Sequence, residues 1–201
     1  MTKNKNFRIH LRAREIVRWL KNNRRMAATP EMQLAVESAI EKSKAFLHPA
    51  AVYTTLTRAT AEKATSIAFP DHSVAASIIA VTIGPLFDSE QTAALQNDDP
   101  RAQFLDALKE EGLQQSIHFA VRLLQEQAKE EECELSSPVL AEDVALLSSL
   151  TTLLGSQRIG IQLNPAQPEW PSHARLVWTY WTPARRAASR KSDAKPVKAA
   201  A

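Results

Sequence analysis

The sequence predicts a single α+β domain over residues 11–183. Three observations carry this prediction: a length of 201 residues, a composition of 44% hydrophobic and 23% charged residues, and long helical periodicities separated by runs of β-branched and aromatic residues. A chain of this length buries roughly 70% of the surface of its unfolded state, so its folding needs no disulfide or metal. The composition excludes collagen-like, fully disordered and multi-span membrane proteins.

The sequence predicts two helices in the first part of the domain. In residues 11–23 the apolar side chains gather on one side and most of the arginines on the other, which is typical of a surface helix. Thr29 and Pro30 are suited to the N-cap and the first position of a second helix, which should end before Pro49.

Three strands are expected next. Residues 51–57 and 65–69 are rich in β-branched and aromatic side chains. Residues 77–83 are mostly apolar and are followed by Gly84 and Pro85, which indicates a central strand that is buried on both faces.

Helices dominate the following stretch. Residues 85–95 predict a short helix, and the Asn-Asp-Asp-Pro sequence at 97–100 supplies an Asp cap and an early Pro for a long one. Gly112 lies within the apolar stripe of the long helix, where a small residue allows another element to approach closely. A last helix over 141–154 should end at Gly155, a suitable C-cap.

Two further strands complete the domain. Alternation places Ile159, Ile161 and Leu163 on one face of a strand over residues 158–163. Residues 175–181 also alternate, and their aromatic side chains are interpreted either as core or as a surface that stacks nucleic-acid bases.

Basic residues gather at the two ends of the chain. Residues 1–25 hold nine Lys or Arg and one acid, residues 183–201 hold six and one, and the stretch between them holds ten basic and twenty acidic residues. We therefore expect a basic N-terminal arm over 1–10 and a disordered basic tail over 184–201. One hypothesis for function follows: a non-enzymatic interaction module whose basic ends bind nucleic acid or an acidic partner.

The cysteine content and the hydropathy indicate the compartment. Cys133 is the only cysteine, which excludes an intrachain disulfide and fits a reducing environment. The sequence has no run of about 20 apolar residues and no secretory h-region, so a cytoplasmic location is expected.

No catalytic group or metal site is predicted. The motifs GxGxxG, GxxxxGK[ST], GxSxG and HExxH are absent, and no histidine has a second His or Cys at ligand spacing. Glu110 and Glu111 point in different directions on a helix and are interpreted as surface charge. Asp106 is either a half-buried acid that needs a partner or an exposed acid in the first turn.

Five short motifs follow one another at compatible spacing between residues 14 and 172. They are Glu15-Ile16 with Trp19-Leu20, Pro49 with Val52-Tyr53, Thr82-Ile83-Gly84-Pro85, Asp106-Ala107, and the run from Arg158 to Leu163. Their order resembles the activation domain of cobalamin-dependent methionine synthase, in particular its short stand-alone relatives.

The resemblance implies a fold of helices packed around a twisted, mainly antiparallel sheet. It also implies a role in a cobalamin (corrinoid)-dependent methyl-transfer system, in which the domain binds S-adenosylmethionine and docks on a cobalamin-carrying partner whose oxidised cobalamin is remethylated. The chain would then be at most an accessory part of a methyltransferase. The positions that match the family motifs, and that we take as candidate cofactor-binding residues, are Thr82, Gly84, Asp106 and Arg158.

One signature of the family is missing. The family binds the carboxylate of S-adenosylmethionine through an Arg that is followed by Gly-Tyr; here Ser137-Pro138 is kept, but its neighbours include Val139 and Leu140. Hydrogen bonds to charged groups are worth about 1.5–3 kcal/mol, so this loss predicts weakened S-adenosylmethionine binding. Arg158 is the candidate replacement for the missing Arg.

Overall fold

The computed structural model describes residues 1–65, 67–99, 101–163 and 170–184. Within them the secondary structure consists of the following helices, strands and one 3₁₀ helix: β1 (Thr2–Lys5), α1 (Ala13–Arg24), α2 (Pro30–Ser43), β2 (Ala50–Thr57), α3 (Arg58–Ala64), β3 (Ala75–Thr82), α4 (Leu86–Gln96), α5 (Ala102–Glu130), β4 (Cys133–Leu135), β5 (Val139–Leu140), α6 (Val144–Leu154), η1 (Ser156–Ile159) and β6 (Ala174–Pro183).

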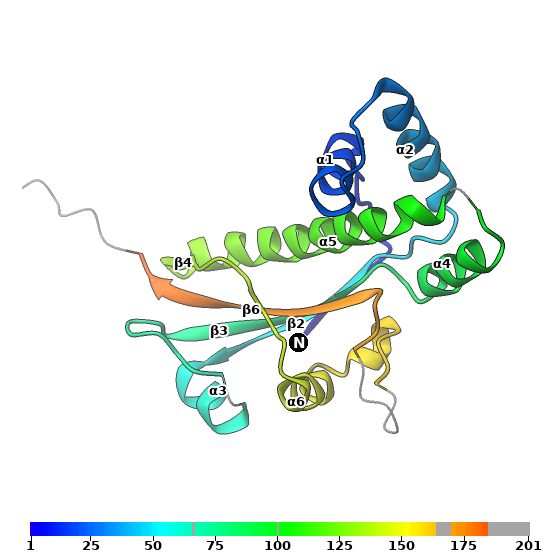
Figure 1. Cartoon of the computed structure of the whole chain (residues 1–201). Coiled ribbons are helices and arrows are strands. Elements are labelled where there is room, and N and C mark those ends of the chain that lie inside the picture. Colours follow the sequence, from blue (N-terminus) through cyan, green and yellow to red (C-terminus); the bar gives the residue numbers. More distant parts are fainter. Residues whose placement is uncertain (66, 100, 164–169, 185–201) are drawn as a thin grey trace, which may run out of the picture.

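Helices cover both faces of one antiparallel sheet (Figure 1). The strand order is β1-β2-β3-β6-β4, with β5 paired to β6, and every pair is antiparallel. The long helix α5 lies along one face and carries α1 and α2 on its outer side, whereas α3 and α6 lie on the other face. The expected α+β fold with a mainly antiparallel sheet is confirmed.

The sheet separates two hydrophobic cores. Ile79 and Val81 of β3 point into the core beneath α5, while Ile78 and Ala80 point into the core above α6. This arrangement explains why the apolar run of β3 has no alternation, since both of its faces are buried.

The aromatic residues near the C-terminal end of the domain belong to these cores. Trp181 is 2% exposed and donates to Ser77 Oγ at 2.7 Å, and Tyr180 donates to the carbonyl of Ala68 at 2.7 Å. Trp178 donates from Nε1 to the Tyr180 hydroxyl at 2.8 Å. The interpretation of these side chains as core is therefore correct, and a base-stacking surface is not formed here.

Several predicted boundaries agree with the structure. Thr29 is the N-cap of α2 and its side chain accepts a hydrogen bond from the Met32 amide. Gly155 ends α6 in the left-handed conformation. Just before α5, Asp99 Oδ1 accepts a hydrogen bond from the Arg101 amide at 2.8 Å, so an aspartate does bind a backbone amide at this end of the helix. Pro100 lies outside the described residues.

Two predicted strands are wrong. Of residues 65–69, those that are described form no strand, and α3 precedes them. Thr65 donates from Oγ1 to the carbonyl of Ala61, and Ile67 is buried in the core between the sheet and α6. Of the run 158–163, Arg158 and Ile159 end the 3₁₀ helix η1, Gly160 follows with a positive φ, and residues 161–163 are coil. Ile159 and Ile161 are buried, but they pack under the sheet and do not extend it, and Leu163 is only partly buried.

The sequence analysis did not predict β1, α3, β4 or β5. Strand β1 pairs with β2 within the stretch 1–10 that was assigned to a basic arm, so part of that stretch belongs to the sheet. Residues 185–201 of the predicted tail lie outside the described residues. The division of the chain at residues 10 and 183 stays a prediction.

Candidate functional site

Thr82 and Gly84 close the end of β3. Thr82 is fully buried; its hydroxyl donates to the carbonyl of His173 at 3.1 Å and accepts from the Gly84 amide at 2.9 Å. Gly84 has a φ of +101°, and a Cβ there would lie 3.0 Å from the Cβ of His48. Both residues therefore shape the backbone at the junction of β3 with α4.

Asp106 is a half-buried acid with three partners. Its carboxylate accepts from Arg24 at 2.6 Å and from Gln91 at 2.7 Å, and Lys109 Nζ lies at 3.4 Å. Burial by itself would raise the pKa of Asp106, but the hydrogen bonds from Arg24 and Gln91 and the charge of Lys109 outweigh it and lower the pKa. The expectation that a half-buried acid here needs a partner is correct.

A chain of polar contacts links Asp106 to Thr82. Lys109 also reaches Ser172 Oγ at 3.5 Å, and Ser172 donates to Asp88 Oδ1 at 2.7 Å. The other oxygen of Asp88 contacts His173 Nδ1 at 2.7 Å, and the carbonyl of His173 accepts from Thr82. Three of the four predicted site residues thus belong to one network, which ties α4 and α5 to the start of β6.

His173 is a buried member of this network, and it contacts the partly exposed Asp88. Burial would raise the pKa of Asp88, but hydrogen bonds from His173 and Ser172, with the charges of His173 and Lys109, outweigh it and lower the pKa. The other ring nitrogen of His173 is buried and has no hydrogen-bond partner among the described residues.

Arg158 lies apart from the other three predicted residues. It is exposed on η1, which packs on β2 and β3 at the face of the sheet opposite to α5. The structure therefore does not bring Arg158 together with Asp106, Thr82 or Gly84.

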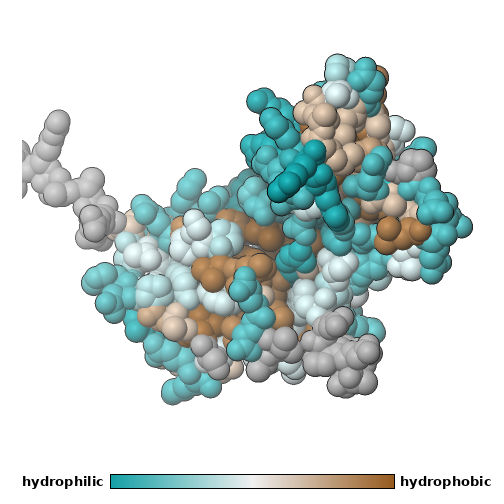
Figure 2. All heavy atoms as spheres, viewed as in Figure 1, coloured by the Kyte–Doolittle hydropathy of each residue, from teal (hydrophilic) through white to brown (hydrophobic). Residues whose placement is uncertain are grey.

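A groove lies where α5 faces β6. It has a volume of about 230 Å³ and an apolar floor of Leu113, Ile117 and Val177, with an ion pair between Arg175 and Glu110 at its side. The two charged side chains meet at 2.6 Å and are 26% and 38% exposed. Figure 2 shows an apolar area near the centre of the view, where α5 and β6 face each other in Figure 1. We call this feature the α5–β6 groove.

The segment that departs from the family signature lines this groove. Pro138 and Leu140 form part of its wall, and β5 pairs Val139 with Trp178 and Leu140 with Val177. Leu140 is 46% exposed, so an apolar side chain stands beside the groove.

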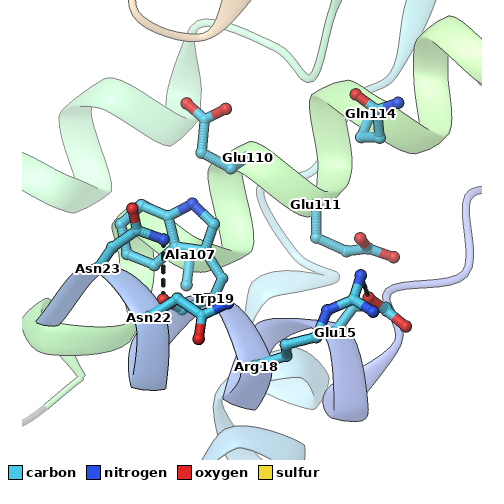
Figure 3. Close-up of a pocket in the computed structure, with 9 residues that line it drawn as sticks. All are labelled: Glu15, Arg18, Trp19, Asn22, Asn23, Ala107, Glu110, Glu111 and Gln114. Carbon is cyan, nitrogen blue, oxygen red and sulfur yellow. Dashed lines mark hydrogen bonds and ion pairs between the residues drawn. The ribbon is translucent and has the colours of Figure 1, made fainter. Parts of the chain in front are cut away.

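A second hollow of about 260 Å³ lies between α1 and α5 and shares Glu110 and Gln114 with the groove. Figure 3 shows Trp19 of α1 lying against α5 beside Ala107, with Glu110 above it. Arg18 and Glu15 form an ion pair at the other end of the hollow. We call it the α1–α5 hollow; together with the groove it makes α5 the common wall of two adjoining depressions.

The interpretation as surface charge is wrong for Glu111, which is buried, whereas the Glu110 side chain is 38% exposed. Glu111 is 8% exposed and accepts from Arg12 Nε at 2.7 Å and from Gln115 at 2.9 Å, while Glu110 pairs with Arg175. The two carboxylates do point in different directions, as expected, but each has a partner distant in sequence. The sequence holds a partial indication that Glu111 is buried, because Glu111 precedes Gly112 of the buried apolar stripe.

Two further findings concern the described residues as a set. None of their groups of His, Cys, Asp and Glu could hold a metal ion with three or more ligands. None of their helices is long and apolar enough to cross a membrane.

No protein-family model matches the sequence, and no curated protein is significantly similar to it. Among solved structures, the chain is similar to the MetH reactivation domain crystallised with AdoHcy, with a TM-score of 0.57 and 13% sequence identity. The likeness covers 92% of this chain and 80% of that one. Identity this low shows the fold alone, and the chain therefore has a fold like that of the MetH reactivation domain.

Proposed function

We propose that this protein is an activation-domain-like accessory protein of a cobalamin-dependent methyl-transfer system and that its α5–β6 groove takes an S-adenosyl ligand. One observation carries the proposal: the fold matches over nearly the whole chain a reactivation domain that was crystallised with AdoHcy. Because a fold can host several functions, the groove has to support the ligand by its own chemistry.

The two depressions on α5 suit an amphipathic ligand of that size. At about 230 and 260 Å³, each is smaller than the 300–1,000 Å³ of typical ligand pockets, but both adjoin Glu110 and Gln114 and together reach that range. The apolar floor can cover the adenosine part, and the indole of Trp19 offers a second flat surface.

The ion pair between Glu110 and Arg175 suits the amino-acid end of the ligand. That end carries an ammonium group and a carboxylate, and the pair presents one group of each opposite sign at the side of the groove. A guanidinium binds a carboxylate through two parallel hydrogen bonds, which is the contact that the missing family Arg would supply. We infer that Arg175, and not Arg158, replaces it.

The partner remains part of the proposal. S-adenosyl binding by this chain supplies a methyl donor, and the cobalamin that accepts the methyl group would be carried by another protein or domain. Here the chain binds and orients the donor and excludes water, while the cobalamin supplies the methyl-transfer chemistry.

Ligand binding is tested by thermal unfolding in the presence of S-adenosylhomocysteine and of S-adenosylmethionine. A ligand at a hundred times its Kd adds about 2.7 kcal/mol to the free energy of unfolding, which corresponds to a rise in Tm of about 5–10 °C. Arg175→Gln should reduce the affinity by about tenfold or more.

Arg158→Gln is the matched control, because it removes the same charge from the opposite face of the sheet. It should bind as the wild type does. No rise in Tm with either compound at millimolar concentration would reject S-adenosyl binding, and a larger loss in Arg158→Gln than in Arg175→Gln would reject the groove as its site.

Docking is tested separately. We expect the purified chain to bind the cobalamin-carrying module of a methionine synthase in a calorimetric titration, more tightly when the cobalamin is oxidised. Equal affinity for the module with and without cobalamin would contradict this role.

A further inference from the structure

Basic side chains from the N-terminal segment, from α5 and from the end of α2 lie near one another on another part of the molecule. Two hollows meet there. The larger, of about 610 Å³, lies between residues 6–10 and 44–49; the smaller, of about 210 Å³, lies between residues 8–10 and the α5 side chains His118 and Arg122. Arg8, Ile9 and His10 line both, so the two hollows adjoin. None of their lining residues lines the α5–β6 groove or the α1–α5 hollow.

The charge around these hollows is of one sign. No Asp or Glu lines either of them, although acids outnumber bases two to one in residues 26–182. Lys44 at the rim is paired with Glu41 at 2.6 Å. Within the described part of the chain, neither Arg8 nor Arg122 has an ion pair or a side-chain hydrogen bond, whereas Arg12, Arg24 and Arg175 each bind a carboxylate.

The walls of the hollows are held in place by contacts of their own. Phe7 stacks on Phe119 of α5 with ring centroids 4.0 Å apart and the rings nearly parallel. The Asn6 amide donates to the carbonyl of Pro49 at 2.9 Å, and the His48 amide donates to the carbonyl of Ile83 at 2.7 Å. The larger hollow thus has a fixed, partly apolar lining. Few of its residues would have to become ordered on ligand binding, so the entropic cost of binding is low.

We propose that these hollows form a binding site for an organic phosphate. Arg8 and Arg122 flank the smaller hollow, where two unpaired guanidinium groups can each bind phosphate oxygens through two hydrogen bonds. The apolar part of the ligand lies in the larger hollow, against Phe7, Leu47 and Pro49. The volume of this hollow falls in the usual range for small-molecule pockets. This site is independent of S-adenosyl binding at the α5–β6 groove.

The proposal is tested by isothermal titration of the full chain with three probes, pyrophosphate, phenyl phosphate and AMP, and with inorganic phosphate and adenosine as reference compounds, at constant ionic strength. Saturable binding is expected for pyrophosphate, and AMP should bind more tightly than both inorganic phosphate and adenosine because it fills both hollows. Arg8→Gln and Arg122→Gln should each reduce the affinity by about tenfold or more. Both arginines are exposed, so these variants should fold, which a circular dichroism spectrum checks.

Arg14→Gln is the matched control, because Arg14 is an exposed arginine on α1 that lines neither hollow. It should leave the affinity unchanged. An equal loss in Arg14→Gln, or no saturable binding of any of the three probes at millimolar concentration, would overturn the proposal. Tighter binding of a single-stranded oligonucleotide than of AMP would also overturn the proposal, if its affinity depended equally on Lys3 and Arg8. Such a result would indicate a diffuse surface that binds polyanions.

Discussion

Gly84 has a backbone conformation that other residues adopt only with strain. Its φ is +101°, and an added Cβ would lie 3.0 Å from His48 Cβ and 3.2 Å from His48 N. We expect Gly84→Ala to lower the free energy of unfolding by about 1–3 kcal/mol, measured by urea denaturation. Gly155→Ala is the control, because its φ is also positive but its nearest neighbour would be 3.6 Å away. A loss in Gly84→Ala no greater than in Gly155→Ala would show that His48 adjusts freely.

Glu111 links the start of α1 to α5. Its buried carboxylate accepts from Arg12 and Gln115, so Glu111→Gln removes the charge while keeping the shape. Because Arg12 is half exposed, water screens the pair, and we expect a loss of only about 1 kcal/mol in urea denaturation. Glu37→Gln, at an exposed position of α2, should change stability by less than about 0.5 kcal/mol. Equal stability of the two variants would mean that the buried pair contributes nothing.

The candidate site shows which residues a sequence can identify and which it cannot. Thr82 and Gly84 were recognisable because the end of a strand is a local feature. Arg175 was not, because its partner Glu110 is 65 residues away and nothing in either neighbourhood indicates the pairing. Only the packing of α5 over β6 brings the two charges together.

Elements with a strong local pattern were predictable. The helices α1, α2, α4 and α6 and the strands β2, β3 and β6 follow from periodicity and end signals. The alternation at Ile159 and Ile161 does not indicate a strand, because the two residues are buried at and just after a turn that has a left-handed glycine at each end. Strand β1 carries no apolar pattern, so only its pairing with β2 identifies it.

The helix α5 packs closely on the sheet at Gly112. A Cβ at Gly112 would lie 3.1 Å from Cγ2 of Ile83, the residue after β3, so Ile83 would have to shift to make room for it. Gly112→Val should push the helix away from the sheet and lower the free energy of unfolding by about 2 kcal/mol or more. Gln125→Val, at an exposed position of the same helix, controls for the helix propensity of valine and should cost less than about 1 kcal/mol. Similar losses in the two variants would contradict close packing at Gly112.

At the scale of the whole molecule, one polar network connects three helices with the sheet. Asp106 contacts Arg24 of α1, Gln91 of α4 and Lys109 of α5, and Asp88 of α4 contacts His173 before β6. These contacts link α1, α4 and α5 to one another and to the start of β6. The packing of the elements that line both depressions along α5 therefore depends in part on carboxylates that lie outside them.

This dependence predicts how stability responds to pH. The pKa values of Asp88 and Asp106 are lowered in the folded state, so both groups bind protons more readily when the chain is unfolded. Their contribution is therefore fully present above the ordinary Asp pKa of about 3.9 and is lost as the pH falls through the lowered values. The double variant Asp88→Asn/Asp106→Asn should be less stable than the wild type at neutral pH and lose less stability between about pH 5 and pH 2 in urea denaturation. Asp71→Asn, in an exposed turn, should keep the wild-type slope. If the free energy of unfolding of the double variant had the wild-type dependence on pH, the loss of stability in acid would arise from other groups. The charges of Asp88 and Asp106 would then contribute nothing to the stability of the network.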